Sequence, residues 1–85
     1  MEIGKISIRP TNHYLTDHSD VSWDLVITTI LSPHKVHPNK QHGKRRLTYI
    51  KRFKDYIVEI HAEKDPVEPI IWVINAFKVK RGEQT

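Results

Sequence analysis

The stretch that decides the fold spans residues 45–63 and reads RRLTYIKRFKDYIVEIHAE. Polar and apolar side chains alternate along it, which is the period of a half-buried β-strand. Lys54 and Asp55, between the two alternating runs, are typical of a tight turn. We therefore predict two strands, 45–53 and 56–63. In the second strand every other residue is apolar, and these residues should face the core: Tyr56, Val58, Ile60 and Ala62.

Two helical segments are predicted ahead of this pair of strands. A helical turn at residues 13–18 can be capped by Thr11 or Asn12, because either side chain can accept a hydrogen bond from a free backbone N–H. Ser22 has the same role for a longer helix that Pro33 ends. Along that helix, apolar residues recur at helical spacing on one face: Trp23, Val26, Ile27, Ile30 and Leu31.

The remaining segments complete an α+β fold. Residues 3–8 read as a short strand, residues 34–43 and 64–69 as loops, and residues 70–79 as a central strand that is apolar on both faces. The expected order is β-α-α-β-β-β, in which the last three strands form an antiparallel meander packed on the helices. A chain of 85 residues fits one such domain.

Composition excludes several classes of function. The chain has no cysteine, so disulfide frameworks, thiolate metal sites and a cysteine nucleophile are excluded. No stretch approaches the roughly 18 consecutive apolar residues that a membrane span needs. The first residues also lack the apolar core of a signal peptide. We expect a cytoplasmic protein with no membrane partner.

The net charge of +4 is unevenly distributed. Residues 34–54 contain eight Lys and Arg residues and no acidic residue, whereas residues 1–33 and 55–85 each carry a net charge of −2. A local positive field attracts phosphates and gains free energy from counterion release. The pattern indicates RNA or another polyanion as a partner. It is also consistent with a solvated loop and strand edge whose lysines discourage aggregation.

The order of elements resembles that of small toxin-like domains in the barnase–EndoU–colicin–RelE ribonuclease superfamily, especially those related to BrnT-type toxins. The matching stretches are His13-Tyr14-Leu15, residues 21–26 (VSWDLV), residues 30–33 (ILSP), the two strands within 45–63, and residues 72–77 (WVINAF). Asp17 stands where an arginine is common, and Asn75 where a threonine is common. The resemblance implies the fold given above, metal-independent RNA cleavage, and an antitoxin protein as a possible partner.

Cleavage of this kind needs a base for the ribose 2′-hydroxyl, cations at the phosphate and an acid for the leaving 5′-oxygen. Histidine suits both proton roles, and the planar fork of arginine suits the phosphate. The resemblance implies His13 as one catalytic residue, with Asp17 at i+4 able to fix its tautomer. His61 is the candidate acid, although a histidine in a salt-bridge ladder fits its position equally well. Arg46 is the candidate phosphate ligand.

Further contacts to RNA are predicted around the strand 45–53. Alternation places Thr48 and Arg52 on the same face as Arg46, and Arg45 and Lys51 on the other face. The predicted RNA-binding residues are Lys44, Arg45, Thr48, Lys51 and Arg52. A charged edge strand would show the same pattern.

Other polar residues leave alternatives open. His18 lies five residues after His13, about 140° round a helix, so the two share a face only if the helix breaks between them. Asn75 interrupts an apolar strand and must find partners, either by tying down a loop or by facing a cleft. His34, His37 and His42 suggest zinc, but structural zinc sites usually include cysteine. We therefore expect no metal and no cofactor.

Three functions remain open on the sequence alone. The first is a toxin-type endoribonuclease that works by acid–base chemistry without metal. The second is a non-catalytic module that binds nucleic acid. The third is a protein-interaction domain of a toxin–antitoxin pair, which pairs with an antitoxin or with a second copy of itself as a homodimer.

Overall fold

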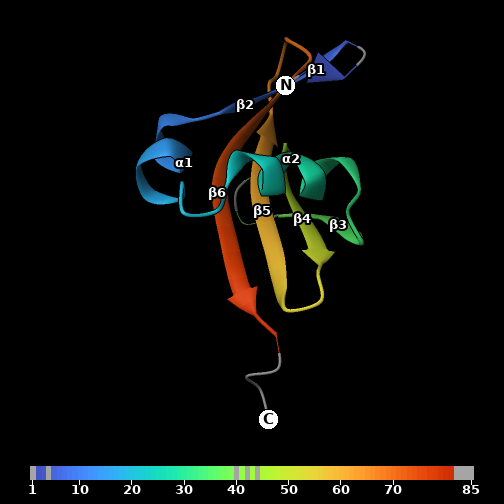
Figure 1. The fold of residues 1–85 in the computed structure, drawn as a ribbon. Coiled ribbons are helices and arrows are strands. Elements are labelled where there is room, and N and C mark those ends of the chain that lie inside the picture. Colours follow the sequence, from blue (N-terminus) through green and yellow to red (C-terminus); the bar gives the residue numbers. More distant parts are fainter. Residues whose placement is uncertain (1, 4, 40, 42, 44, 82–85) are drawn as a thin grey trace.

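The computed structural model describes residues 2–3, 5–39, 41, 43 and 45–81. Within these residues, six strands and two helices follow one another as β1, β2, α1, α2, β3, β4, β5 and β6 (Figure 1). Their bounds are β1 Glu2–Ile3, β2 Ile6–Pro10, α1 Asn12–Asp17, α2 Trp23–Leu31, β3 Lys35–Pro38, β4 Arg46–Arg52, β5 Tyr56–Lys64 and β6 Ile70–Lys80.

The strands form one mixed sheet in the spatial order β1-β2-β6-β5-β4-β3. β4, β5 and β6 are an antiparallel meander. β2 runs parallel to β6, with Ser7 opposite Ile70 and Pro10 opposite Val73. This parallel pair is possible because both helices and three strands separate β2 from β6 along the chain. The predicted α+β class and its meander are confirmed.

Two predicted boundaries are corrected. Residues 34–43 were predicted to be a loop, but residues 35–38 form the strand β3, so this prediction is wrong for them. β3 pairs antiparallel with β4, with Lys35 opposite Ile50 and Pro38 opposite Leu47. β3 is the outermost strand, where a proline is tolerated because only one side of the strand is hydrogen-bonded. The strand predicted at residues 3–8 is divided into β1 and β2, which form a short antiparallel hairpin.

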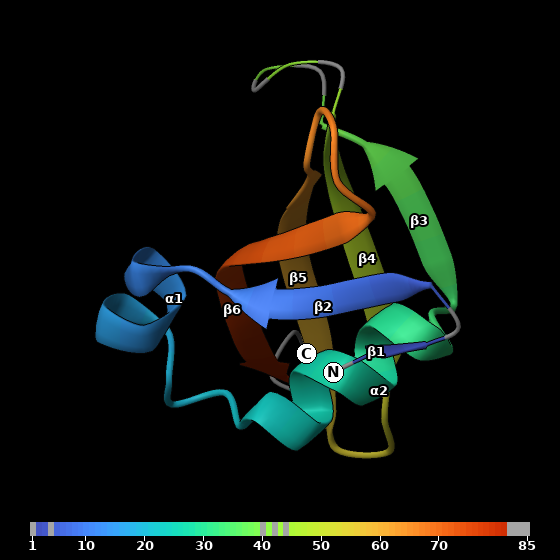
Figure 2. The same cartoon turned by 90° about the horizontal axis from the view of Figure 1, so that it is seen from above.

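Side-chain caps start both helices. Thr11 and not Asn12 is the cap of α1, since its side chain accepts a hydrogen bond from Tyr14 N at 3.3 Å. The Ser22 side chain accepts one from Leu25 N at 3.3 Å and caps α2, as predicted. α2 packs against β4 and β5 on one face of the sheet, whereas α1 lies beside the edge of β6 (Figure 2).

The core lies between α2 and the sheet. Val58, Ile60 and Ala62 on β5 are buried as predicted, and the whole buried cluster is Ile8, Tyr14, Val21, Val26, Ile30, Tyr49, Val58, Ile60, Ala62, Val73 and Ala76. Burial raises the pKa of Tyr49 and of Tyr14, and the charge of Asp20 raises that of Tyr14 further. The Tyr14 hydroxyl donates a hydrogen bond to the Val21 carbonyl, which ties α1 to the start of α2.

A carboxylate fixes the loop that leads into β6. Asp65 accepts hydrogen bonds from the backbone N–H groups of Val67 and Glu68, and from the indole N–H of Trp72 at 3.0 Å. These bonds favour the ionised carboxylate and hold the pKa of Asp65 below its usual range, the Glu68 N–H making the largest contribution. The start of β6 is thereby anchored to the end of β5.

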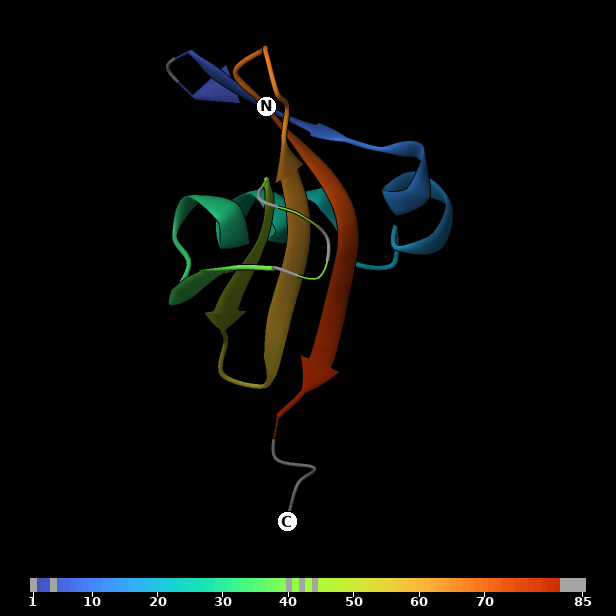
Figure 3. The ribbon, with the colours of Figure 1, turned by 180° about the vertical axis from the view of Figure 1, so that it is seen from behind.

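A β-bulge in β6 changes which of its residues face the core. His61 lies opposite Asn75, but Ala62 lies opposite Val73, so Ile74 is one extra residue on β6. Regular alternation would put Val73 and Asn75 on the same face. Because of the bulge, Val73 and Ala76 are both buried in the core. Asn75 contacts His61 on the opposite face, which carries no helix and is seen in Figure 3.

The Tyr14 hydrogen bond gives a test of the core. We expect Tyr14→Phe to lower the free energy of unfolding by about 1–3 kcal/mol, because it leaves the buried Val21 carbonyl without its donor. Urea denaturation at neutral pH measures this as a lower midpoint with an unchanged slope. Tyr56→Phe, at a half-buried tyrosine, is the matched control and should change stability by less than about 0.5 kcal/mol. Equal midpoints for the two variants would contradict this role of Tyr14.

Candidate functional site: a histidine network beside β6

His13 and His18 meet because α1 ends between them. The last helical residue is Asp17, and His18 follows as the C-cap with φ −130° and ψ 12°. A continuous helix would hold the two rings about 140° apart. Instead, the two Nε2 atoms lie 3.2 Å apart, and the ring centroids are separated by 4.9 Å. The helix therefore ends between His13 and His18, which is the condition under which the two rings can lie on one face.

The other nitrogen of each ring has a partner of its own. His13 Nδ1 lies 3.2 Å from an Asp17 carboxylate oxygen, and both side chains are about half exposed, at 50% and 55%. His18 Nδ1 lies 3.1 Å from the Ala76 carbonyl oxygen. β2 ends opposite Val73, and the His18 ring hydrogen-bonds further along the same edge of β6. These two bonds fix the orientation of both imidazoles.

The bonding partners also determine where the protons lie. A carbonyl oxygen only accepts, so His18 Nδ1 carries a hydrogen, and in the neutral ring Nε2 then directs a lone pair toward His13. If neutral His13 donates its Nδ1 hydrogen to Asp17, its own Nε2 lone pair faces that of His18 at 3.2 Å. Two lone pairs at this distance repel each other. A proton or another cation held between the Nε2 atoms removes the repulsion, and the Asp17 carboxylate balances its charge.

Phe77 connects this pair to His61. Its ring meets the His18 ring edge-on at a centroid distance of 5.1 Å and the His61 ring at 5.4 Å. Phe77 is 40% exposed, although it comes from an apolar strand. The contacts join α1, β6 and β5 into one continuous network, which we call the histidine network: Asp17, His13, His18, Phe77, His61, Asn75 and Glu59.

Both ring nitrogens of His61 are hydrogen-bonded. Nε2 lies 2.6 Å from a Glu59 carboxylate oxygen, and Nδ1 lies 3.1 Å from the side-chain nitrogen of Asn75. A carboxylate accepts and an NH₂ group donates, so the bonds match a neutral imidazole with its hydrogen on Nε2. The His61 side chain is 17% exposed. Asn75 therefore finds its partner on the neighbouring strand β5 and does not tie down a loop.

Arg46 lies on the same sheet face as His61. Thr48 is opposite His61 and Arg46 is opposite Glu63, so Arg46 and His61 are diagonal neighbours, typically about 7–8 Å apart between Cα atoms. Arg46 Nε donates to Glu63 at 3.4 Å, and the Arg46 side chain is 15% exposed. His61 and Arg46 therefore share one face of the sheet, whereas His13 lies on α1 and is linked to His61 through the rings of His18 and Phe77.

The predicted RNA-binding residues are not gathered into one surface. Thr48 is only 3% exposed, which leaves little of its side chain for RNA to contact. Lys51 Nζ donates to the Ser32 carbonyl at 2.7 Å and so binds the C-terminal end of α2. Arg45 and Arg52 are exposed, and the Arg45 charge lies near enough to Asp65 to act on it. Lys44 lies outside the described residues.

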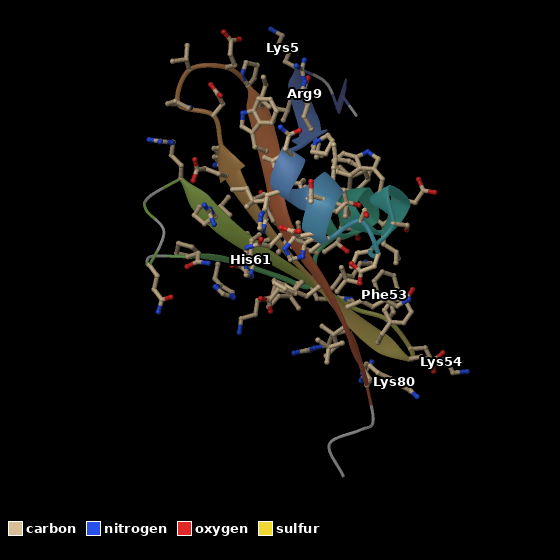
Figure 4. The ribbon with its side chains drawn as sticks, turned by 90° about the vertical axis from the view of Figure 1, so that its left-hand side faces the viewer. Lys5, Arg9, Phe53, Lys54, His61 and Lys80 are labelled. Atoms are coloured by element: carbon tan, nitrogen blue, oxygen red, sulfur yellow. The ribbon has the colours of Figure 1, made fainter. Side chains whose placement is uncertain are left out.

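A second group of cations surrounds two stacked aromatic rings at the β4–β5 turn. Phe53 and Tyr56 stack at a centroid distance of 4.9 Å, and Lys78 Nζ lies 4.5 Å from the Tyr56 ring. Lys51 Nζ lies 5.9 Å from the Phe53 ring, and Arg81 donates to the Phe53 carbonyl at 2.8 Å. We call these five residues the hairpin-end cluster. Lys54 and Lys80 lie at the same end of the molecule as this cluster. Lys5 and Arg9 lie at the other end, and His61 lies between the two ends (Figure 4).

The histidines of the 34–43 segment are separate from this network. His34 Nδ1 accepts a hydrogen bond from Arg52 N at 2.9 Å, which joins β3 to the end of β4. His37 is exposed, and His42 lies outside the described residues. Among the residues that the structure describes, no three His, Cys, Asp or Glu side chains are grouped so as to hold a metal ion.

The largest of the described cavities, about 390 Å³, lies between β2, α1 and the start of α2. Arg9 is the one cation among its lining residues, which are Ile8, Arg9, Pro10, Tyr14, Leu15, Ser19 and Trp23. None of the three predicted catalytic residues lines this cavity. The histidine network is therefore a surface site on the sheet and is separate from this cavity.

Comparison of the chain with protein-family models, curated proteins and solved structures returned no match. The function of this domain is therefore inferred from its own residues. In the described part of the chain, no helix has the length and apolar character needed to cross a membrane.

The hydrogen bonds of His61 predict its tautomer. We expect long-range ¹H–¹⁵N spectra of the neutral ring to show its hydrogen on Nε2, because Glu59 accepts there and Asn75 donates to Nδ1. Exposed His37 is the internal control and should show averaged nitrogen signals. A His61 ring with its hydrogen on Nδ1 would contradict this arrangement.

Proposed function

We propose that this domain is an endoribonuclease that cleaves RNA by acid–base chemistry and needs no metal. The observation that carries the proposal is the environment of His13. Its half-exposed ring has a carboxylate at one nitrogen and a second imidazole at the other, and it belongs to the network that contains His61. An exposed imidazole that is oriented by a carboxylate is the arrangement that general bases use.

In the proposed reaction, His13 Nε2 accepts the proton of the ribose 2′-hydroxyl. The 2′-oxygen then attacks phosphorus, a 2′,3′-cyclic phosphate forms, and the bond to the 5′-oxygen breaks. His18 supports the base, since its Nε2 lone pair faces the nitrogen that takes up the proton. Asp17 balances the positive charge that His13 acquires.

His61 and Arg46 have the remaining roles. We assign to the protonated form of His61 the proton that the leaving 5′-oxygen receives. In that form Nδ1 also carries a hydrogen, which the Asn75 amide accepts by turning its oxygen toward the ring, and RNA must replace Glu59 as the partner of His61 Nε2. Arg46 uses one guanidinium nitrogen for Glu63, which leaves the others to bind the phosphate. The resemblance to RelE- and BrnT-like toxins supports the same activity. It adds an antitoxin as the proposed partner and the cytoplasm as the proposed location.

This function predicts a metal-independent product. Purified protein incubated with RNA and EDTA should release fragments that end in 2′,3′-cyclic phosphate. His13→Ala should slow cleavage by about 100-fold or more, which is the usual contribution of a general base. His37→Ala, a change at an exposed histidine outside the network, is the matched control and should retain the activity. Equal cleavage by the His13 and His37 variants would remove His13 from the mechanism.

A second candidate function is binding of nucleic acid without cleavage. The hairpin-end cluster favours it, because stacked aromatic rings flanked by lysines resemble surfaces that hold single strands through stacking and phosphate contacts. Under this alternative, the histidine network stabilises the sheet and has no catalytic role. Lys54 and Lys80 belong to the same end of the molecule (Figure 4).

The binding candidate predicts a salt-sensitive complex. Lys78→Ala and Lys54→Ala should each weaken binding of single-stranded RNA and lower the slope of log K against log salt by about 1, if each lysine contacts one phosphate. Lys5→Ala, at the opposite end of the molecule, is the matched control (Figure 4). Fluorescence anisotropy with a labelled oligonucleotide at several salt concentrations measures both quantities. Equal losses in all three variants would contradict a site at the hairpin end.

A further inference from the structure

We propose that His13 and His18 form a binding site for a divalent transition-metal ion, and that Zn²⁺ fits it best. Spacing along the chain does not indicate a metal at these two residues, because the histidines with zinc-like spacing are His34, His37 and His42. The two imidazoles come from either side of the end of α1 and direct their Nε2 atoms at each other.

The separation of the two nitrogens matches that of tetrahedral ligands. Zinc binds histidine at about 2.0–2.1 Å, so two histidines on one tetrahedral ion have nitrogens about 3.3 Å apart. Neighbouring ligands of a square-planar ion at the same bond length would be about 2.9 Å apart. The observed Nε2–Nε2 distance is 3.2 Å. The separation of the two nitrogens is therefore closer to that of tetrahedral ligands than to that of square-planar ones.

The outer hydrogen bonds are those of metal-binding histidines. In metal sites the second ring nitrogen usually donates to a carboxylate or a backbone carbonyl, which fixes the ring and makes its lone pair more basic. His13 Nδ1 contacts the Asp17 carboxylate, and His18 Nδ1 contacts the Ala76 carbonyl. With both hydrogens used in this way, both Nε2 lone pairs point into the space between the rings. The ion would lie there.

The rest of the coordination shell is open to solvent. No third protein ligand completes the site among the described residues, so water or a small ligand would fill the remaining positions. His13 is half exposed, which gives the ion an entry path, and the Phe77 ring packs edge-on against His18. Two protein ligands make a weaker site than the four of a structural zinc site, so we expect exchangeable binding.

The proposed site stands whether or not the domain cleaves RNA. One consequence does depend on the proposed function: a metal ion would occupy the His13 lone pair that takes the 2′-hydroxyl proton, so Zn²⁺ should inhibit cleavage. The test of binding is therefore made without RNA. Its result does not depend on whether the ribonuclease proposal succeeds.

The experiment is calorimetric titration of the full, chelator-treated chain with ZnCl₂, together with the visible spectrum of the Co²⁺ complex. We expect one ion per chain and the strong absorption of tetrahedral Co²⁺. His13→Ala and His18→Ala should each weaken binding at least about tenfold, and Asp17→Asn should weaken it about tenfold through the orientation of His13. His37→Ala is the matched control and should bind as the wild type does.

Tryptophan fluorescence and circular dichroism show whether each variant is folded. His18→Ala loses the hydrogen bond to the Ala76 carbonyl and could therefore unfold. In the described part of the chain, the His13 ring nitrogens contact only the side chains of Asp17 and His18. His13→Ala should therefore stay folded and keep the test valid. Unchanged Zn²⁺ affinity in folded His13→Ala would overturn the proposal. So would loss of binding in His37→Ala, or a wild-type chain that binds neither ion.

Discussion

The arrangement of this domain depends on a single extra residue, Ile74, in the central strand β6. The bulge that it makes lets Val73 and Ala76 both enter the core, although they are three residues apart. It also moves Asn75 onto the face that carries His61. Without the bulge, Asn75 would lie on the core face together with Val73, where a buried amide needs partners that an apolar core does not supply.

The histidine network follows from this geometry and from the short length of α1. α1 is six residues long and ends before His18, so the chain turns and the two imidazoles meet. His18 then hydrogen-bonds the Ala76 carbonyl at the edge of β6, beyond the end of β2. An edge of this kind would otherwise present free backbone groups to another chain. The His18 ring, which covers this part of the β6 edge, is also the ring that contacts His13.

The positive window at residues 34–54 serves two purposes in the folded protein. Arg46 is paired with Glu63 across the sheet, and Lys51 binds the carbonyl at the end of α2, so these two charges take part in internal contacts. Lys51 also belongs to the hairpin-end cluster, together with Lys78 of β6 and Arg81, which follows β6. The number of charges along the chain shows where the basic residues are concentrated. Which of these charges face solvent in the folded protein depends on which of them have internal partners.

The sequence by itself determined the α+β class, the capping of α2 by Ser22 and the inward face of β5, because these depend on local spacing that side chains impose on their own segment. It also placed Asp17 within reach of His13. Only the tertiary structure decided that β3 joins the sheet and that Thr48 is buried. It also decided that His18 and Phe77 connect His13 to His61, and that Asn75 contacts His61. These features depend on pairing between distant strands and on a bulge whose position is set by its partner strand, and no local pattern records either.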